Sequence, residues 1–362
     1  MLRSLLTLVL VLCNLSARAD EPSTIRSDER VVFFQTAASR SPDKTRWSVP
    51  VHLWVFEPTE SEFIQRRLLG QLSEAAGTVL TAKSRELFDQ RIRGFMVDNE
   101  RGKNIGIRIA GTRHVLGDSG ADGHFAGFIE LTDTQVRQHA KDGWLSMEAI
   151  LPEDSTRRIT GKVQLVEPAG VTVISDIDDT VKVSNVTDRQ KLLANTFLRP
   201  FRVMDGIPAL YRKWSGSGAV ICFVSSSPWQ LYQPLLDWMV AEKFPPTTFE
   251  LQRVRFKDRS LLKLFGDPLK SKLLRIEPIL KRFPGRQFVL VGDSGEKDPE
   301  VYGELARRFP AQVTAILIRN VTQERASAAR FRIAFESVPE EHWQLFDLVQ
   351  EIREPEILRR DE

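Results

Sequence analysis

Acidic side chains directly follow two apolar runs in the second half of this 362-residue sequence. Asp176 and Asp178 come after the run Val171–Ile174. Asp293 comes after a second run, Phe288–Val291. In a parallel sheet, ligands bind just beyond the carboxyl ends of the strands, and carboxylates crowded there repel one another unless a cation or a proton lies between them. The pattern predicts acid–base or metal-assisted chemistry, although a lone D-x-D-x-T string is equally compatible with a turn that caps a helix.

Further polar groups occur at comparable places. Ser225 and Ser226 follow another apolar run, where hydroxyls and free backbone N–H groups at the start of a helix suit a phosphate. Lys272 begins a predicted helix, and Asp298 stands five residues after Asp293. Each group alone has an ordinary structural explanation, namely a helix cap, a solvated surface lysine or a turn. Their combination in this order favours a phosphate site.

Apolar runs that alternate with helical segments must position these groups. The predicted strands are Val171–Ile174, Ala219–Val224, Phe288–Val291 and Val313–Ile318. The predicted helices are Ile207–Trp214, Trp229–Glu242, Lys270–Phe283 and Pro299–Phe309. Near-continuous apolar strands are typical of a parallel sheet buried on both faces, so residues 169–330 are predicted to form a doubly wound α/β domain. In residues 331–362 we expect a helix over Glu340–Ile352, packed on the sheet, and a frayed tail.

The region before this domain has a different pattern. Residues 20–168 are rich in branched and aromatic runs separated by turn signals, with helical stretches near Ser61–Glu74 and Thr81–Gln90. This pattern predicts a β-rich, sandwich-like domain.

The order of the groups resembles that of the haloacid dehalogenase-like phosphohydrolases. At a finer level, the strings SDIDDTVKVSNV, VSSSPWQLY and LVGDSGEKDPEVY resemble the actin-patch-type, Mg²⁺-dependent phosphatidate phosphatase family. The FPGRQF link and the VEPAG lead-in do so as well, and the resemblance spans about Glu167 to Arg319. One departure is Ser271, because relatives usually have a histidine just before the motif lysine.

The resemblance implies roles for the acidic residues. Asp176 would attack phosphorus and form an aspartyl-phosphate, and Asp178 would act as general acid and then as general base. Mg²⁺ would be held by the side chains of Asp176 and Asp293 and by the backbone carbonyl of Asp178. Asp179 is left between shaping the turn and tuning the metal.

The resemblance also implies the phosphate contacts. Ser225, the N–H of Ser226 and Lys272 would hold the phosphoryl oxygens during transfer. Asp298 would orient Lys272 or metal-bound water, and Thr180 would shape the turn.

The substrate implied by the resemblance is phosphatidate, which would be released as diacylglycerol and inorganic phosphate. The short intervals between the motifs leave little room for a large cap, so we expect an open site. The basic and apolar segment Val254–Lys270 is interpreted either as a peripheral contact with an anionic membrane or as a packed loop. Two alternatives stay open, namely another phosphomonoester as substrate and a non-catalytic module that binds a lipid or a protein.

Charge and the first residues bear on partners and location. The formal net charge of +3 is too small to indicate nucleic-acid binding. Arg3, the apolar run Leu5–Leu12 and the A-x-A site at Ala17–Ala19 are typical of a secretory signal peptide over residues 1–19. We therefore expect export to the periplasm or the medium, with an uncleaved membrane anchor as the alternative.

Overall fold

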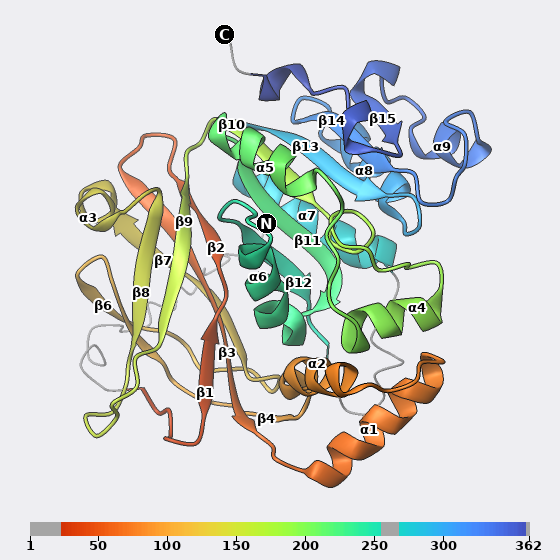
Figure 1. Cartoon of the computed structure of the whole chain (residues 1–362). Coiled ribbons are helices and arrows are strands. Elements are labelled where there is room, and N and C mark those ends of the chain that lie inside the picture. The colour runs from red at the N-terminus through yellow and green to blue at the C-terminus, as the bar shows by residue number, and fades with distance from the viewer. Residues whose placement is uncertain (1–22, 255–267, 360–362) are drawn as a thin grey trace, which may run out of the picture.

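The computed structural model describes residues 23–254 and 268–359, which form two regions, each built on a β-sheet (Figure 1). The predicted signal peptide and most of the segment 254–270 lie outside the described residues. Within the described ranges, no helix is both long and apolar enough to cross a bilayer.

The N-terminal region contains one curved sheet. Its nine described strands are β1 (Arg30–Phe33), β2 (Thr36–Arg40), β3 (Arg46–Pro58), β4 (Val97–Asn99), β5 (Gly106–Ile109), β6 (Thr112–Val115), β7 (His124–Thr132), β8 (Trp144–Ile150) and β9 (Thr160–Val166). Alternate residues of β3, such as Val49, Val51 and Leu53, are buried with residues of β5, β8 and β9 in a single core. The sheet therefore curls around this core, and the sandwich-like arrangement expected from the sequence stays a prediction.

Helices interrupt this sheet at two places. The hairpin α1 (Glu62–Ala75) and α2 (Ala82–Ile92), followed by η1 (Arg93–Phe95), is inserted between β3 and β4, and α3 (Asp133–His139) follows β7. Side chains define where the hairpin helices begin, because Ser61 accepts from the backbone N–H of Ile64 and Thr81 forms a capping box with Ser84. The two helical stretches predicted near these positions are confirmed.

The C-terminal region contains a parallel sheet. Its described strands are β10 (Gly170–Ser175), β11 (Val220–Pro228), β12 (Thr248–Gln252), β13 (Arg286–Asp293), β14 (Val313–Arg319) and β15 (Trp343–Phe346), arranged as β12-β11-β10-β13-β14-β15. Every neighbouring pair of these described strands is parallel. The direction of winding reverses between β10 and β13, which is where ligands bind in sheets of this kind. The predicted parallel α/β arrangement is thus confirmed.

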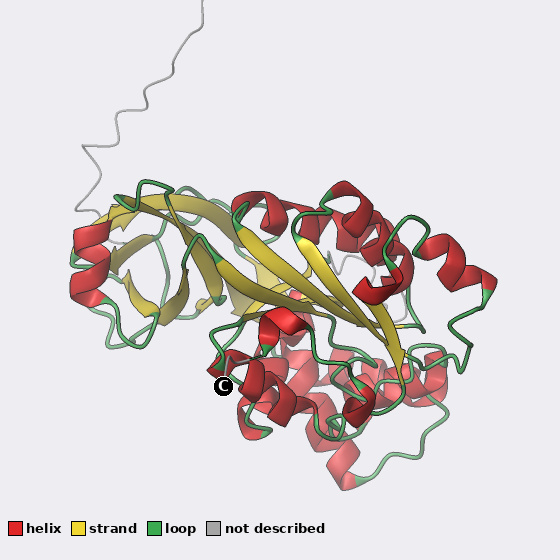
Figure 2. Ribbon diagram, turned by 90° about the horizontal axis from the view of Figure 1, so that it is seen from above, coloured by secondary structure: helices red, strands yellow, loops and turns green. Residues whose placement is uncertain are grey.

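Helices cover both faces of this sheet (Figure 2). Alternate residues of each strand enter different cores, so that Val173 packs with α5 and α6 while Ile174 packs with α7 and α8. The described helices are α4 (Arg189–Leu193), η2 (Ala194–Leu198), α5 (Ile207–Gly216), η3 (Trp229–Leu231), α6 (Tyr232–Ala241), α7 (Pro268–Arg282), α8 (Asp298–Arg308) and α9 (Ala329–Ala334).

The prediction of a helix over Glu340–Ile352 is wrong. This stretch forms η5 (Glu340–His342), the strand β15 and η6 (Val349–Glu351), and β15 pairs with β14. The Trp343 ring stacks on Phe335 at 4.5 Å, so side-chain packing at the sheet edge outweighs helix propensity here. The segment 331–362 therefore supplies a strand and not a separate helix. The described part of its tail is anchored too, since η7 (Glu356–Leu358) buries Leu358.

A buried arginine fixes the link between the two regions. Arg286 of β13 donates to the carbonyl oxygens of Glu167, Ala169 and Val171 and to the Thr172 hydroxyl. Between these acceptors, Gly170 has a φ of +115°, a conformation that favours glycine. The FPGRQF link thus holds the chain where β9 passes into β10.

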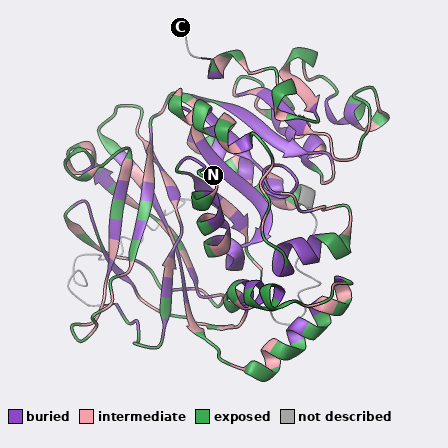
Figure 3. Cartoon of the chain, in the orientation of Figure 1, coloured by how far each residue is buried: buried purple, intermediate pink, exposed green. Residues whose placement is uncertain are grey.

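The two regions also share one hydrophobic core, and Figure 3 marks buried residues on the ribbons of both regions. Phe34 lies 4.2 Å from Trp229, measured between ring centroids, and the Tyr232 hydroxyl accepts from the backbone N–H of Gln35. On the other side of the contact, Arg91 of α2 donates to backbone carbonyls of η2 and of the residue after it, Arg199. At the boundary expected at residue 168, the chain therefore passes from one sheet to the other while the hydrophobic core continues.

A histidine pair in this contact predicts that acid destabilises the protein. His52 Nε2 lies 3.0 Å from His124 Nδ1, and burial lowers the pKa of His124 to about 4 and that of His52 well below its usual value. In the unfolded chain the histidine pKa values are near 6.5, so below that pH the unfolded chain binds more protons than the folded one. The unfolding free energy is therefore unaffected by the pair above about pH 6.5 and falls as the pH drops below it. His124 alone accounts for a loss of about 3 kcal/mol by pH 4.

Urea unfolding at pH 7.5 and pH 5.0 measures this effect. The difference in unfolding free energy between the two pH values should shrink in His124→Asn, whose amide retains a polar group near His52. An unchanged difference would contradict the assignment.

Candidate active site

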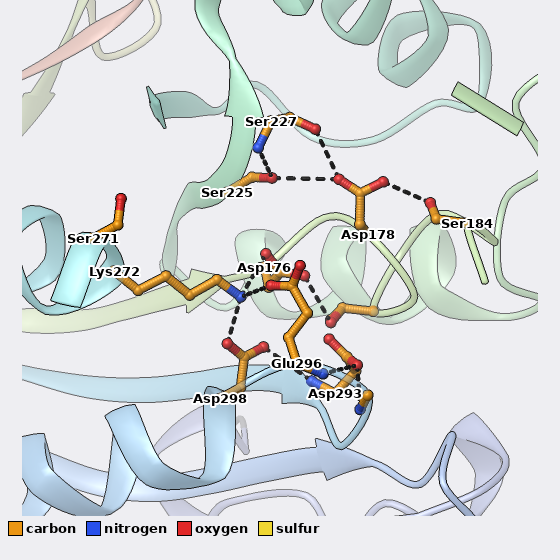
Figure 4. A network of polar contacts seen from close by, with 12 residues as sticks. Asp176, Asp178, Ser184, Ser225, Ser227, Ser271, Lys272, Asp293, Glu296 and Asp298 are labelled. Carbon is orange, nitrogen blue, oxygen red and sulfur yellow. Dashed lines mark hydrogen bonds and ion pairs between the residues drawn. The ribbon is translucent and has the colours of Figure 1, made fainter. Parts of the chain in front are cut away.

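Acidic groups and one lysine converge beyond the carboxyl ends of β10 and β13 (Figure 4). Asp176 immediately follows β10, and its backbone N–H donates to Val291 of β13 at 2.9 Å. Asp293 ends β13, Lys272 lies on α7 and Asp298 is the first residue of α8. The parallel pairing of β10 and β13 thus brings together side chains that are more than 100 residues apart in the sequence.

Lys272 lies at the centre of the buried charges. Its Nζ is 3.0 Å from Asp176 Oδ1 and 2.8 Å from Glu296 Oε2, and it also contacts Asp298 Oδ1. Burial alone would lower the pKa of Lys272, but the surrounding carboxylates outweigh it and hold the pKa well above its usual value. Lys272 is therefore a permanent ammonium group beside Asp176.

Asp298 connects Lys272 to β13. Its Oδ1 contacts the ammonium, and its Oδ2 accepts from the backbone N–H of Asp293 at 3.1 Å. A Cβ atom on Gly292 would lie 2.3 Å from Asp298 Oδ2, so this close approach requires glycine. Asp298 thus joins Lys272 to the backbone of β13, and its positioning role stays a prediction.

Three carboxylates are placed to hold a cation. Among the described residues, Asp176, Asp293 and Glu296 offer oxygens within 4.8 Å of one another. Asp293 Oδ1 accepts from the N–H groups of Gly295 and Glu296, whereas Asp293 Oδ2 is buried with no hydrogen-bond partner in the described part of the chain. Burial raises the pKa of Asp176 and Asp293 well above the usual value, and neighbouring carboxylates raise it further. An all-oxygen donor set with unneutralised negative charge fits Mg²⁺.

A second lysine holds Asp178. Lys182 Nζ lies 2.6 Å from Asp178 Oδ1, and the hydroxyls of Ser184 and Ser227 donate to Asp178 at 2.6 and 2.8 Å. Ser225 Oγ is more distant, at 3.5 Å from Asp178 Oδ2. Burial alone would raise the pKa of Asp178, but Lys182 and the serine hydroxyls outweigh it and lower the pKa. Asp178 is therefore held as a carboxylate in this arrangement.

The serine loop at the end of β11 lies against Asp178. Ser225 Oγ accepts from the backbone N–H of Ser227 at 3.0 Å. Ser226 Oγ is buried with no hydrogen-bond partner among the described residues. A buried hydroxyl without a partner costs free energy unless a ligand satisfies it, whereas the phosphate contact expected through the backbone N–H of Ser226 stays a prediction.

The turn after Asp176 is closed by its own side chains. Thr180 Oγ1 donates to Asp176 Oδ2 at 3.3 Å. Asp179, at a φ of +56°, accepts from the backbone N–H groups of Ser184, Asn185 and Val186. The Asp179 carboxylate is thus bound by the backbone of its own loop, which favours the role of shaping the turn over that of tuning the metal.

Sequence reasoning missed several members of the site, namely Lys182, Ser184, Ser227 and Glu296. Glu296 stands three residues after Asp293 in the GDSGEKD string, and Lys182 stands four residues after Asp178, so spacing alone offered a signal for both. Ser271, noted as a departure, lies apart from the carboxylate cluster in Figure 4 and accepts from Arg275 at 2.7 Å.

Replacing Lys182 by methionine is expected to lower kcat/KM for phosphate release by about 10²- to 10³-fold. The substitution removes the ion pair that orients the buried Asp178 carboxylate, so the group is no longer positioned for proton transfer. Steady-state phosphate release measures the effect. The matched control is Lys191→Met, which removes an exposed ammonium that pairs with Asp188 at the surface and should leave the rate unchanged. Equal rates in the two variants would contradict the role of Lys182.

Known proteins are similar to this chain over the part that carries these side chains. Residues 171–320 match the family model described as the catalytic domain of phosphatidate phosphatase APP1. Over 158 residues, 42% of this chain and 26% of the relative, the chain is 39% identical to phosphatidate phosphatase APP1 of Saccharomyces cerevisiae. It is 25% identical over 266 residues to the uncharacterized protein C29B5.04c of Schizosaccharomyces pombe, which covers 70% of this chain and 44% of that relative. The chain thus spans less than half the length of either curated relative.

A solved structure with partial similarity is the β-glucuronidase of Parabacteroides merdae. It is 9% identical, has a TM-score of 0.26 and covers 81% of this chain and 34% of its own.

The fold and the site together define a class of parallel α/β proteins. In this class, carboxylates and a buried lysine lie beyond the strand ends, at the place where the direction of winding of the sheet reverses. Within that class, residues 171–320 are similar to the catalytic domain of the actin-patch-type phosphatidate phosphatases.

Proposed function

We propose that this chain is a Mg²⁺-dependent phosphatidate phosphatase with a doubly wound, haloacid dehalogenase-like catalytic domain. The observation that carries the proposal is the contact of Asp176 with both the Lys272 ammonium and the cluster of Asp293 and Glu296. A carboxylate nucleophile can approach an anionic phosphate only where positive charge surrounds both. The similarity of residues 171–320 to the phosphatidate phosphatases supports phosphatidate as the substrate.

The chemistry follows from the positions of the side chains. An Asp176 carboxylate oxygen attacks phosphorus, the phosphorus–oxygen ester bond breaks, and the leaving diacylglycerol oxygen takes a proton from Asp178. Water then attacks the aspartyl-phosphate, Asp178 takes the proton from that water, and inorganic phosphate leaves while Asp176 is regenerated. Lys272, Ser225 and Ser226 hold the phosphoryl oxygens. Mg²⁺, held by Asp176, Asp293, Glu296 and the Asp178 carbonyl, would neutralise charge between nucleophile and phosphate.

The proton on Asp178 depends on the serine loop. Ser227 donates to Asp178 Oδ2 and contributes to its lowered pKa. When phosphoryl oxygens draw this hydroxyl away, one of the interactions that hold Asp178 ionised is lost, which favours the protonated form needed for the first step.

Export is the second part of the proposal. Residues 1–19 would direct the chain out of the cytoplasm and be removed after Ala19, so the enzyme would meet its lipid at a membrane surface outside the cytoplasm. Intact-mass measurement on protein recovered from the medium or the periplasm tests this. A full-length mass in the membrane fraction would favour the uncleaved anchor.

The decisive assay is phosphate release from phosphatidate in mixed micelles, with a soluble aryl phosphate in parallel and each with and without Mg²⁺. Turnover of the lipid that requires Mg²⁺ would support the full proposal. Turnover of the aryl phosphate alone would retain the mechanism and replace the substrate with another phosphomonoester. No turnover by folded protein would favour a non-catalytic binding module, which has no need of the opposed Asp176 and Lys272.

A further inference from the structure

A groove of about 1480 Å³ runs between the N-terminal region and α6. One wall comes from the N-terminal region and includes Phe56 and Met96. The other wall comes from the segment after the serine loop and includes Trp229, Gln230 and Trp238. Sites for small drug-sized ligands usually measure about 300–1000 Å³, so this groove has room for a longer ligand.

The lining of the groove suits a ligand without net charge. Its floor is aromatic, with Phe34 packed on Trp229 at 4.2 Å and Phe201 on Trp238 at 5.8 Å between ring centroids. Among the described residues that line it, four are basic and four are acidic. The lining thus mixes aromatic and polar side chains with no net charge, which favours an uncharged occupant over an anion.

Two polar atoms among the lining residues have no partner. Gln230 Oε1 and Trp238 Nε1 are buried in residues that are each 9% exposed, and neither has a hydrogen-bond partner in the described part of the chain. A buried polar atom is ordinarily satisfied by a protein group, water or a ligand. Both residues line the groove, and a ligand that carries ester and hydroxyl groups along with apolar chains can satisfy this acceptor and this donor.

The groove begins close to the phosphate-binding loop. Gln230 follows Ser227, whose hydroxyl contacts Asp178, by three residues. Three residues of chain span on the order of 10 Å at most. A single molecule can therefore place its phosphate at the serine loop and its apolar part in the groove.

We propose that this groove binds the two acyl chains of the lipid substrate, so that the N-terminal region supplies one wall of the lipid site. This inference rests on the proposed function, because it takes the ligand at the serine loop to be a phosphorylated lipid. It assigns the N-terminal sheet and its helical hairpin a direct part in selecting long-chain substrates. It also identifies diacylglycerol, which is the same apolar part without the phosphate, as a ligand of the groove.

Two groove variants and one matched control test the proposal. Gln233→Trp fills the groove from α6, and Met96→Glu places a carboxylate in the wall from the N-terminal region. Val240→Trp is the control, because Val240 lies on the same helix as Gln233, is 69% exposed and does not line the groove. Thermal melting of each variant first shows that it is folded.

The direct measurement is fluorescence anisotropy of a diacylglycerol that carries one NBD-labelled acyl chain, recorded with EDTA present. The proposal predicts that the Kd rises tenfold or more in Gln233→Trp and Met96→Glu and changes by less than twofold in Val240→Trp. Equal affinities in all three variants, or equal losses in Gln233→Trp and Val240→Trp, would overturn it. Binding of the probe requires no catalysis, so this readout is independent of the phosphatase proposal.

The activity measurement separates the two proposals. The ratio of kcat/KM for long-chain phosphatidate to that for an aryl phosphate should fall tenfold or more in Gln233→Trp. Lipid hydrolysis with an unchanged ratio would refute the groove and keep the proposed function. Probe binding that is lost in the groove variants of a protein that releases no phosphate would refute the proposed function and keep the groove as a lipid site.

Discussion

Replacing Asp176 with asparagine is expected to reduce phosphate release by about a thousandfold or more and, at the same time, to stabilise the metal-free fold. The rate falls because an amide does not attack phosphorus and is a poor ligand for a hard cation. The stability rises because the buried Asp176, Asp293 and Asp298 and the half-buried Glu296 lie close together, and the ammonium of Lys272 neutralises only part of their charge. Asparagine removes one of the negative charges that are in excess over the positive charge of the ammonium. Each unit by which the pKa of Asp176 is raised corresponds to about 1.4 kcal/mol recovered at neutral pH.

Phosphate release with Mg²⁺ and urea unfolding in EDTA measure the two effects on the same preparation. The matched control is Asp118→Asn in an exposed turn, which should alter neither quantity. Opposite changes in activity and stability distinguish a functional site from a structural ion pair, because a structural carboxylate would lose stability when neutralised. Mg²⁺-dependent turnover close to wild type would refute Asp176 as the nucleophile.

Replacing Lys272 with methionine should instead abolish activity and destabilise the protein. Methionine has nearly the length of lysine but leaves the carboxylates of Asp176, Glu296 and Asp298 without a counter-ion. Removing one partner from a buried ion pair typically costs about 3–5 kcal/mol. Urea unfolding in EDTA should show a loss of that order, and added Mg²⁺ should restore part of it, since a cation replaces some of the missing positive charge.

Lys270→Met is the control for this experiment. Lys270 lies on the same helix and is exposed, so its substitution should change the unfolding free energy by less than about 0.5 kcal/mol. Equal stability of the two variants would contradict the central place of Lys272 among the carboxylates.

The central strands and most helices were predictable from the sequence because their signals are local. Four apolar runs matched β10, β11, β13 and β14, since a strand buried on both faces is apolar throughout its length. β12 and β15 were not predicted, because edge strands are short and mixed in character. In β15, Trp343 acquires its role only from the packing of its ring on Phe335, a contact that no local pattern encodes.

The candidate site was predictable only as far as its motifs extend. Asp176, Lys272, Asp293 and Asp298 meet in the structure as their places at strand and helix ends suggested. Lys182 was passed over because a lysine in a loop is usually solvated, and its burial became visible only once the chain was folded. The groove beside the site could not be predicted at all, since its walls come from segments well over 100 residues apart.

The hydrogen bonds of Arg286 to the link between the two regions affect the order in which the molecule is assembled. The carbonyls that Arg286 binds belong to residues 167, 169 and 171, which are synthesised more than 100 residues earlier. The N-terminal sheet can close around its own core as it emerges, but the stretch 167–171 that leads into β10 lacks its arginine contacts until β13 has been made. Conditions or variants that slow the arrival of β13 should therefore prolong a state in which the N-terminal sheet is formed while the direction of the chain at residues 167–171 is not yet fixed.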